Sequence, residues 1–474
     1  MKDSTETGTT GAVAAAPAAV TERHPRAREM LVLMAVCAGL VQAMAAAMNL
    51  AVPALARSSL HPSPSQLVWM VDTYLIAFAC LLIPGGALAD RLGRKGVLLT
   101  GLGLFAGGCL LAGSADSVPV LIAGRAVAGA GAALALPVTL GLLMLLFPGS
   151  ERPKAVAAWT SAVAVGGILG NAVGGAVLQY LPWQGLFAVF GAAGALVLAV
   201  AVPRVPRTPR REAPLDPVGS SLLAASVVAL LYGLVEGREL GWGSAAVLVS
   251  FAVAVLIAVS FVLVGLRRRH PLVDPRVFAL PRLRAGALGV VTAFFGAFAM
   301  FYVNAQYLTV AHGYSLLLAG CAIAPIAVSM TVASRSSVRL VRRFGVRRVV
   351  GSGFAAQVLG LAAFSLVGPS TPYLGYVLCP AVVLAGVGLA LPPLSGGIMD
   401  SLPPASAGTG SGINGAAREI GSALGVAAMG TALGSHVAGQ AASAAALSAS
   451  MDSGFRVVAC AVAVLGVLVV RWSE

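Results

Sequence analysis

The chain has 474 residues, of which 58% are hydrophobic and 10% are charged, and its mean hydropathy is +0.91. Soluble domains carry about 25% charged residues, so this composition excludes a chain that is mainly solvated by water. The net charge of +14 does not indicate nucleic-acid binding, because the basic residues lie in short loops and no nucleic-acid-binding motif accompanies them.

In chain order, residues 1–30 come first and are rich in Ala and Thr before they become charged. They lack a small-residue cleavage site behind a short apolar core, which a signal peptide would need. We therefore expect a disordered cytoplasmic N-terminal tail over residues 1–30.

Apolar runs of about 20 residues then recur, each long enough to cross roughly 30 Å of hydrocarbon. Pro, Gly and charge clusters separate them. The sequence therefore predicts an all-α polytopic membrane protein with fourteen spans. The predicted spans are residues 31–54, 67–89, 96–115, 119–147, 154–180, 183–202, 217–236, 243–265, 284–311, 314–338, 346–368, 372–399, 407–435 and 453–472.

The distribution of Lys and Arg predicts the orientation of these spans. With the N-terminus inside, Arg57, Arg238 and Arg456 fall on the outer side, Arg125 and Arg418 lie within spans, and the remaining Lys and Arg are on the inner side. One missed span would invert every later loop, so the bias supports the span count as well as a cytoplasmic location for both termini.

Two long basic inner loops flank the seventh and eighth spans. They predict an N-terminal six-helix bundle over residues 31–202, a linker with two extra transmembrane helices over 203–283, and a C-terminal six-helix bundle over 284–474.

A repeat relates the two predicted bundles. The inner loop "GALADRLGRKGVLL" aligns with the later loop "SSVRLVRRFGVRRVV" when Gly93 is placed on Gly345, which also matches Arg91 with Arg343 and Lys95 with Arg347. Internal repeats of this kind are typical of transporters whose substrate site lies between the halves near the middle of the membrane.

Three motifs resemble those of the major facilitator superfamily. The loop that begins at Gly86 is similar to the superfamily's signature loop between helices two and three. "RAVAGAGAA", from Arg125, resembles its fourth-helix motif, and "GGILGNAVGG", from Gly166, resembles its fifth-helix antiporter motif.

Other segments resemble one branch of that superfamily, the fourteen-span drug:proton antiporters. They are "NLAVP" from Asn49, "WMVDTYLIAF" from Trp69 and "REIGSALGVAAMG" from Arg418. The resemblance implies the major facilitator fold, with two six-helix bundles plus two additional helices. It also implies a bacterial multidrug or antibiotic efflux transporter that functions as a monomer.

Two departures from the branch leave an alternative open. Met44 stands where the branch usually has an Asp in helix one, and Asn171 stands where the antiporter motif usually has Pro. A metabolite symporter or uniporter of the same fold is therefore the second hypothesis. A transport-inactive membrane receptor or assembly factor is a third, which the absence of a recognisable soluble signalling domain argues against.

Asp72 and Glu419 are the acids that the prediction places well inside spans. At 1.5 Å per residue, Asp72 and Arg125 lie about 8 and 9 Å from the outer ends of their spans. A charge within a span is a functional hypothesis by default. We expect Asp72 to face the bundle near Arg125 and to act as a protonation switch, the alternative being a structural polar pair.

Glu419 lies about 18 Å inside its span, near the middle of the bilayer. Because adjacent residues on a helix do not face each other, we expect Arg418 and Glu419 to serve different surfaces. Glu419 is then a second candidate for proton coupling, or it merely neutralises Arg418 through a third residue.

The signature loop predicts a conformational gate. Asp90 can bond to neighbouring helix ends, and the glycines allow close packing and a tight turn; the alternative is simple positive-inside anchoring. In the second repeat Arg342 replaces the acid. The predicted gate comprises Gly86, Asp90, Arg91, Gly93, Arg94 and Lys95.

Two further groups complete the candidate residues. Small residues of the antiporter motif predict close helix contact, with Asn171 bonding across it. Met and aromatic side chains suit an adaptable cavity, although such stripes also occur in cores and on lipid-facing surfaces. The antiporter group is Gly166, Gly170, Asn171, Gly174 and Gly175, and the cavity group is Met44, Met48, Asn49, Phe294, Phe298, Phe301, Tyr302 and Asn304.

The sequence contains no P-loop, no Ser/His/Asp arrangement and no metal-ligand spacing, so we expect a non-enzyme without cofactors. The preference for Arg over Lys and the Ala- and Gly-rich usage suggest a GC-rich bacterial genome. The predicted function is proton-coupled secondary active efflux of hydrophobic or amphiphilic organic compounds, such as drugs or antibiotics, across the bacterial cytoplasmic membrane by alternating access. The expected partners are a small organic substrate, protons and membrane lipids.

Overall fold

The computed structural model describes residues 25–473 except 149, 209–215, 269–270, 272, 311, 315–317, 319–321, 323, 369–370, 404–405 and 438–443. Most of the predicted N-terminal tail, residues 1–24, lies outside the described residues. The first six helices are α1 (Ala27–Ala56), α2 (Pro64–Leu92), α3 (Arg94–Gly113), α4 (Val118–Leu146), α5 (Arg152–Tyr180) and α6 (Trp183–Arg204). The remaining elements are α7 (Pro217–Leu240), α8 (Ala245–Arg267), the short η1 (Pro275–Ala279), α9 (Pro281–Val310), α11 (Ala324–Phe344), α12 (Val346–Phe364), α13 (Tyr373–Asp400), α14 (Ala407–Val437) and α15 (Ala444–Trp472).

Each predicted span overlaps one of these long helices. Eleven of the described helices are long and apolar enough to cross a membrane by length and composition. The exceptions are α11, α12 and α14, which are less apolar: α11 carries four arginines, and α14 is rich in Gly, Ser and Thr. The tenth predicted span, 314–338, falls partly on undescribed residues, and its described part belongs to α11.

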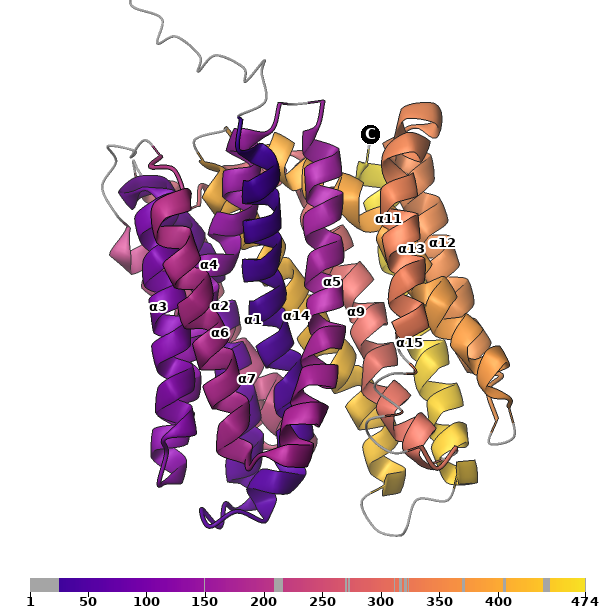
Figure 1. Cartoon of the computed structure of the whole chain (residues 1–474). Helices are drawn as coiled ribbons and strands as arrows, with labels where there is room; N and C mark the ends of the chain where they lie inside the picture. The colour runs from indigo at the N-terminus through magenta and orange to yellow at the C-terminus, as the bar shows by residue number, and fades with distance from the viewer. Residues whose placement is uncertain are drawn as a thin grey trace, which may run out of the picture.

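The helices pack in two groups (Figure 1). In the first, α3 and α2 pack on α4, α1 packs on α5, and α6 packs on α3. In the second, α9 packs on α13, α14 and α15, while α12 and α11 pack on α13. We call these the N-half and the C-half. They meet where α2 and α4 contact α14 and where α5 contacts α11 and α13.

The helix α7 packs against both α2 and α14, and so touches both halves, whereas α8 packs on α7 and η1. Apolar residues of α2, α7 and α14, including Cys80, Leu231 and Ala427, form a buried cluster at this contact. Val255 and Leu256 of α8 are exposed, as expected for a helix that faces lipid.

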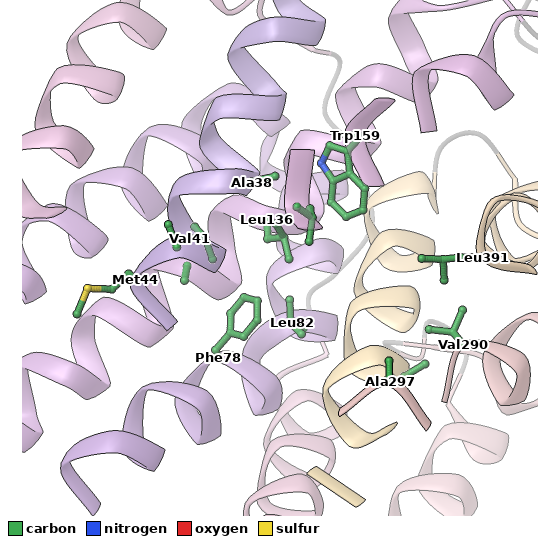
Figure 2. Packing of buried hydrophobic residues seen from close by; sticks show 14 of the residues in the cluster. Ala38, Val41, Met44, Phe78, Leu82, Leu136, Trp159, Val290, Ala297 and Leu391 are labelled. Atoms are coloured by element: carbon green, nitrogen blue, oxygen red, sulfur yellow. The ribbon is translucent and has the colours of Figure 1, made fainter. Parts of the chain in front are cut away.

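Buried apolar side chains join the halves into one core. Val41, Phe78 and Leu136 come from the N-half, and Val290 and Leu391 come from the C-half (Figure 2). The buried indole of Trp159 in this core has a hydrogen-bond acceptor, because its Nε1 donates to Thr139 Oγ1 at 2.9 Å. This pair of polar groups satisfies its bond inside the apolar interior, as burial requires.

Both halves of the sequence repeat form the same turn. Gly93 joins α2 to α3 with φ of 97°, and Gly345 joins α11 to α12 with φ of 82°. A side chain would be strained at such angles, so glycine is required at both turns. The end of the molecule where these two turns lie, together with the start of α1 and the end of α15, is called the basic end below.

Candidate functional site

The Asp90 carboxylate binds the start of α14, which lies more than 300 residues later in the chain. Its Oδ1 accepts from Gly408 N at 2.9 Å, and its Oδ2 accepts from Thr409 N at 2.9 Å and from the Thr409 hydroxyl at 3.3 Å. These are the free N–H groups and the positive end of a helix, where a carboxylate is favoured. We call this contact the Asp90 cap.

Arg94 completes the Asp90 cap on the N-half side. Its Nη2 donates to Asp90 Oδ1 at 2.8 Å and its Nη1 donates to Gly141 O at 3.1 Å. Both charged side chains are at most 4% exposed. Buried charged groups that are fully bonded in this way hold their geometry strongly, and removal of either one leaves the other buried without its partner.

The other predicted gate residues surround this contact. Gly86 packs directly on the Gly408 carbonyl, so a methyl group there would collide with the α14 backbone. Arg91 is buried, Lys95 is half-buried and Gly93 forms the turn. The structure thus brings the predicted gate together, and it adds Gly408 and Thr409, which sequence reasoning missed.

A second pair of charges lies between the halves at the same end. Arg152 at the start of α5 and Asp400 at the end of α13 line one cavity of about 160 Å³, together with Met144, Leu402 and Ala407. The charges of Arg152 and Arg282 both act on the Asp400 carboxylate. Opposite charges on the two halves therefore attract across this cavity.

Arg125 lies deep in the N-half and is 1% exposed. Its Nε donates to Met70 O and its Nη2 to Val71 O, both at 2.9 Å, and its Cζ lies 4.7 Å from the Tyr74 ring centre. Its Nη1 has no hydrogen-bond partner within the described part of the chain. A buried guanidinium nitrogen left without a bond is costly, so this atom is open to a further acceptor.

The hydrogen bonds of Arg125 go to the backbone carbonyls of Met70 and Val71, and the expected proximity of Asp72 shows as an interaction between the two charges. Met70 and Tyr74 mark the buried face of α2 towards α4, and Asp72 is two residues from each, on another face of the helix. Asp72 is half-buried and still acts on Arg125 through its charge. It shares its face with Trp69 and Ile76, which belong to the cluster against α7.

The expectation that Arg418 and Glu419 serve different surfaces is wrong. Arg418 donates from Nε and Nη2 to Glu419 Oε1 at 3.2 and 3.1 Å. The two side chains are long enough to curl towards each other although their Cα–Cβ bonds diverge. The guanidinium Cζ also lies 5.8 Å from the Phe294 ring centre, which brings one residue of the predicted cavity to this pair.

Tyr74 connects the two charged groups, and sequence reasoning missed it. It is fully buried, its hydroxyl donates to Val41 O of α1 at 3.0 Å, and the charges of Arg125, Arg418 and Glu419 all act on it. We call Asp72, Tyr74, Arg125, Arg418 and Glu419 the central charged cluster. The sequence feature that could have identified Tyr74 is its position two residues after Asp72, the acid predicted to lie within a span.

The antiporter motif forms the α1–α5 contact. Gly166 and Gly170 pack on the backbone of Gly39 and Ala43, and a Cβ on Gly174 would lie 2.9 Å from Ala47 Cβ. Gly175 and Asn171 are half-buried. Asn171 makes no hydrogen bond to any described residue, so the predicted bond across the interface is absent from the described structure.

The described side chains of the predicted cavity group lie in the core or pack against it, and none of them lines the cavity between Arg152 and Asp400. Met44 and Met48 are fully buried, and Asn304 accepts the Tyr376 hydroxyl. The aromatic side chains Phe294, Phe298, Phe301 and Tyr302 are partly buried against the core. The side chain of Asn49 lies outside the description.

Among the described residues, no three His, Cys, Asp or Glu side chains lie close enough to share a metal ion. A buried carboxylate such as Glu419 can bind a proton and change its ion pair with Arg418, and such a change of charge can drive a conformational switch.

Residues 31–426 match the model of the Major Facilitator Superfamily. The cephamycin export protein CmcT of Amycolatopsis lactamdurans is 34% identical over 94% of this chain and 93% of its own length. A methylenomycin A resistance protein of Streptomyces coelicolor is 32% identical over 80% of each chain. The multidrug resistance protein Stp of Mycobacterium tuberculosis is 31% identical over 85% of this chain and 76% of its own.

Solved structures of low sequence identity share the fold. The human organic anion transporter MFSD10 superposes with a TM-score of 0.65 at 17% identity, over 94% of this chain and all of that one. The proton:xylose symporter XylE superposes with a TM-score of 0.64 at 16% identity, over 94% of both chains.

Proposed function

The chain belongs to the Major Facilitator Superfamily, and on this premise we propose that it exports small hydrophobic or amphiphilic organic compounds in exchange for protons. Relatives that are named for cephamycin export, methylenomycin A resistance and multidrug resistance support an antibiotic or drug as the substrate. Since these relatives match most of the chain, the same overall process of efflux is expected here.

The basic end faces the cytoplasm in this proposal, with both termini inside and fourteen membrane spans in all. The positive-inside bias of the loops supports this orientation. The three less apolar helices, α11, α12 and α14, are then spans that protein neighbours partly shield from lipid. The location is the bacterial cytoplasmic membrane, and one chain suffices for transport.

The Asp90 cap is the observation that carries the mechanism. It ties the N-half to the start of α14 of the C-half with a buried, fully bonded carboxylate. While it holds, the cytoplasmic end stays closed and the substrate path can open only outwards. Tilting of the halves that pulls α14 away breaks these bonds and opens the path inwards, as alternating access requires.

The central charged cluster supplies proton coupling in this proposal. Glu419 is 12% exposed and bonded to Arg418 when ionised. A proton on Glu419 removes its charge and weakens that bond, which frees the Arg418 guanidinium. Tyr74 interacts with the charges of Arg418 and Glu419 in the C-half and with that of Arg125 in the N-half. Protonation of Glu419 therefore alters the electrostatic environment that Tyr74 shares with Arg125.

Asp72 is the second coupling acid in the proposal, and it acts at the contact with α7. It lies on the α2 face that packs there, while α7 also touches α14. A proton on Asp72 therefore changes the charge at a contact shared by both halves. The residues of the predicted cavity nearest to these acids, Phe294 and its neighbours, are the proposed substrate contacts.

Expression in a drug-sensitive bacterial host tests the export function. We expect wild type to raise resistance to some antibiotics and to lower their accumulation in energised cells, and a protonophore to abolish this difference. A control strain carries Asp90→Lys, which cannot cap α14. Substrate accumulation inside the cells above the level of the empty vector would contradict export and favour the symporter alternative.

A further inference from the structure

A cavity of about 470 Å³ lies at the basic end, between the start of α1 and the end of α6, away from the central charged cluster. The residues that line it play no part in the transport mechanism proposed above. They are Pro25, Arg26, Met30, Pro203, Arg204, Val205 and Pro206.

Positive charge converges on this cavity from both helices. Arg26 is the N-cap of α1, Arg204 is the last residue of α6, and both side chains are exposed. Arg26 makes no side-chain capping bond, and the first turn of α1 carries one exposed acid, Glu29. Two guanidinium groups beside a helix N-terminus suit a phosphate group in charge and geometry.

The floor of the cavity is apolar. Met30 and Val205 are each 1% exposed and lie beneath the arginines, and three prolines complete the walls. A soluble inorganic anion makes no favourable contact with such an apolar lining. An amphiphilic ligand with an anionic headgroup can contact both the arginines and the apolar residues.

An apolar surface continues from the cavity along the two helices, which contact each other and lie side by side in Figure 1. Val32 and Val36 of α1 and Leu196 and Val202 of α6 are all exposed. Since α1 starts and α6 ends at the basic end, these residues begin at the depth where the acyl chains of a bound lipid begin.

We propose that this cavity binds the headgroup of an anionic phospholipid, with its phosphate between Arg26 and Arg204 and its acyl chains along α1 and α6. With the orientation given above, the lipid belongs to the cytoplasmic leaflet, where anionic headgroups bind basic pockets between transmembrane helices. The bound lipid ties the N-half to that leaflet while the C-half moves.

Lipid binding to the purified full-length protein tests this proposal without any transport assay. Native mass spectrometry and thermal unfolding are measured with phosphatidylglycerol, with zwitterionic phosphatidylcholine and with inorganic phosphate. We expect phosphatidylglycerol alone to remain bound and to raise the unfolding temperature. The variant Arg26→Gln/Arg204→Gln should bind it at least tenfold more weakly, and its unfolding temperature without lipid reports whether it folds.

The matched control is Arg339→Gln/Arg348→Gln, which removes two exposed arginines of the basic end outside the cavity. It should bind phosphatidylglycerol like wild type. Equal weakening in both variants would mean diffuse attraction to the basic end and would overturn the proposal. So would equal binding of inorganic phosphate, which would mean a soluble-anion site, or equal binding of phosphatidylcholine. Because neither substrate nor proton gradient is present, failure here leaves the export function untouched.

Discussion

Asp90 makes polar contacts with residues more than 300 positions later in the chain, and these contacts explain why an acid lies in the last turn of the apolar helix α2. Its carboxylate accepts two backbone N–H groups, one hydroxyl and one guanidinium. No isosteric residue can do the same, because an amide loses the charge and one of the two acceptor oxygens.

The variant Asp90→Asn should therefore destabilise the closed contact between the halves at the basic end by about 1.5–3 kcal/mol, the usual range for a hydrogen bond to a charged group. Spin labels on the exposed residues Leu92 and Phe344 report the separation of the halves at that end. We expect the distance distribution to shift to longer values in Asp90→Asn. Glu29→Gln, which neutralises an exposed acid at the same end, should leave it unchanged; unchanged distances in both variants would refute the role of the cap.

Residue identities predicted which charges lie within spans but not which atoms they contact. Asp72, Arg125 and Glu419 stand out in the sequence because charges in apolar runs are rare. The partners depend on helix rotation and side-chain length: Arg125 reaches backbone carbonyls past Asp72, and Arg418 curls onto its neighbour. The position of a residue in the sequence predicts its depth in the membrane. Depth alone does not predict the bonding partners of Arg125 and Arg418.

At the level of elements, the α1–α5 contact depends on glycine at fixed positions of one face. Gly166 and Gly170 let the backbones touch, and Gly174 continues the row one turn later. Close packing of this kind replaces the hydrophobic effect as the source of helix association in lipid.

A single methyl group tests that contact. Gly170→Ala places a Cβ on the Ala43 carbonyl and should destabilise the protein by about 1–3 kcal/mol, as overpacking does. Gly167→Ala meets only Gln42 Cγ at 3.8 Å and should be neutral or slightly stabilising, since Ala favours helices. Thermal unfolding of both variants in detergent separates them, and equal melting temperatures would show that the α1–α5 packing is looser than described.

Helix positions were predictable from sequence because a bilayer demands apolar runs of a set length. The predicted span 119–147 and the helix α4 (Val118–Leu146), for example, differ by one residue at each end. The position of α7 was not predictable. Its packing between α2 and α14 depends on tertiary contacts that no pattern in its sequence encodes.

At the scale of the whole molecule, two different charged contacts join the halves at the basic end. The Asp90 cap is a direct contact, and the second repeat has Arg342 where its acid would be. Arg152 and Asp400 oppose each other across a cavity instead, so the second contact is a longer-range attraction.

Charge exchange probes this second contact. Asp400→Arg places like charge beside Arg152 and Arg282 and should open the cytoplasmic end, measured with the same pair of spin labels. Adding Arg152→Asp should restore part of the closed population. If the double variant is as open as the single one, the two residues do not attract each other across the halves.

The most direct test of proton-coupled export is the pH gradient of everted membrane vesicles when a transported antibiotic is added. The account predicts that wild type dissipates an inside-acid gradient on addition of substrate. Glu419→Gln should abolish this response at matched expression, and Asp72→Asn should reduce it. Clear substrate flux without any proton movement in wild type would contradict the account and leave a uniporter or another coupling ion.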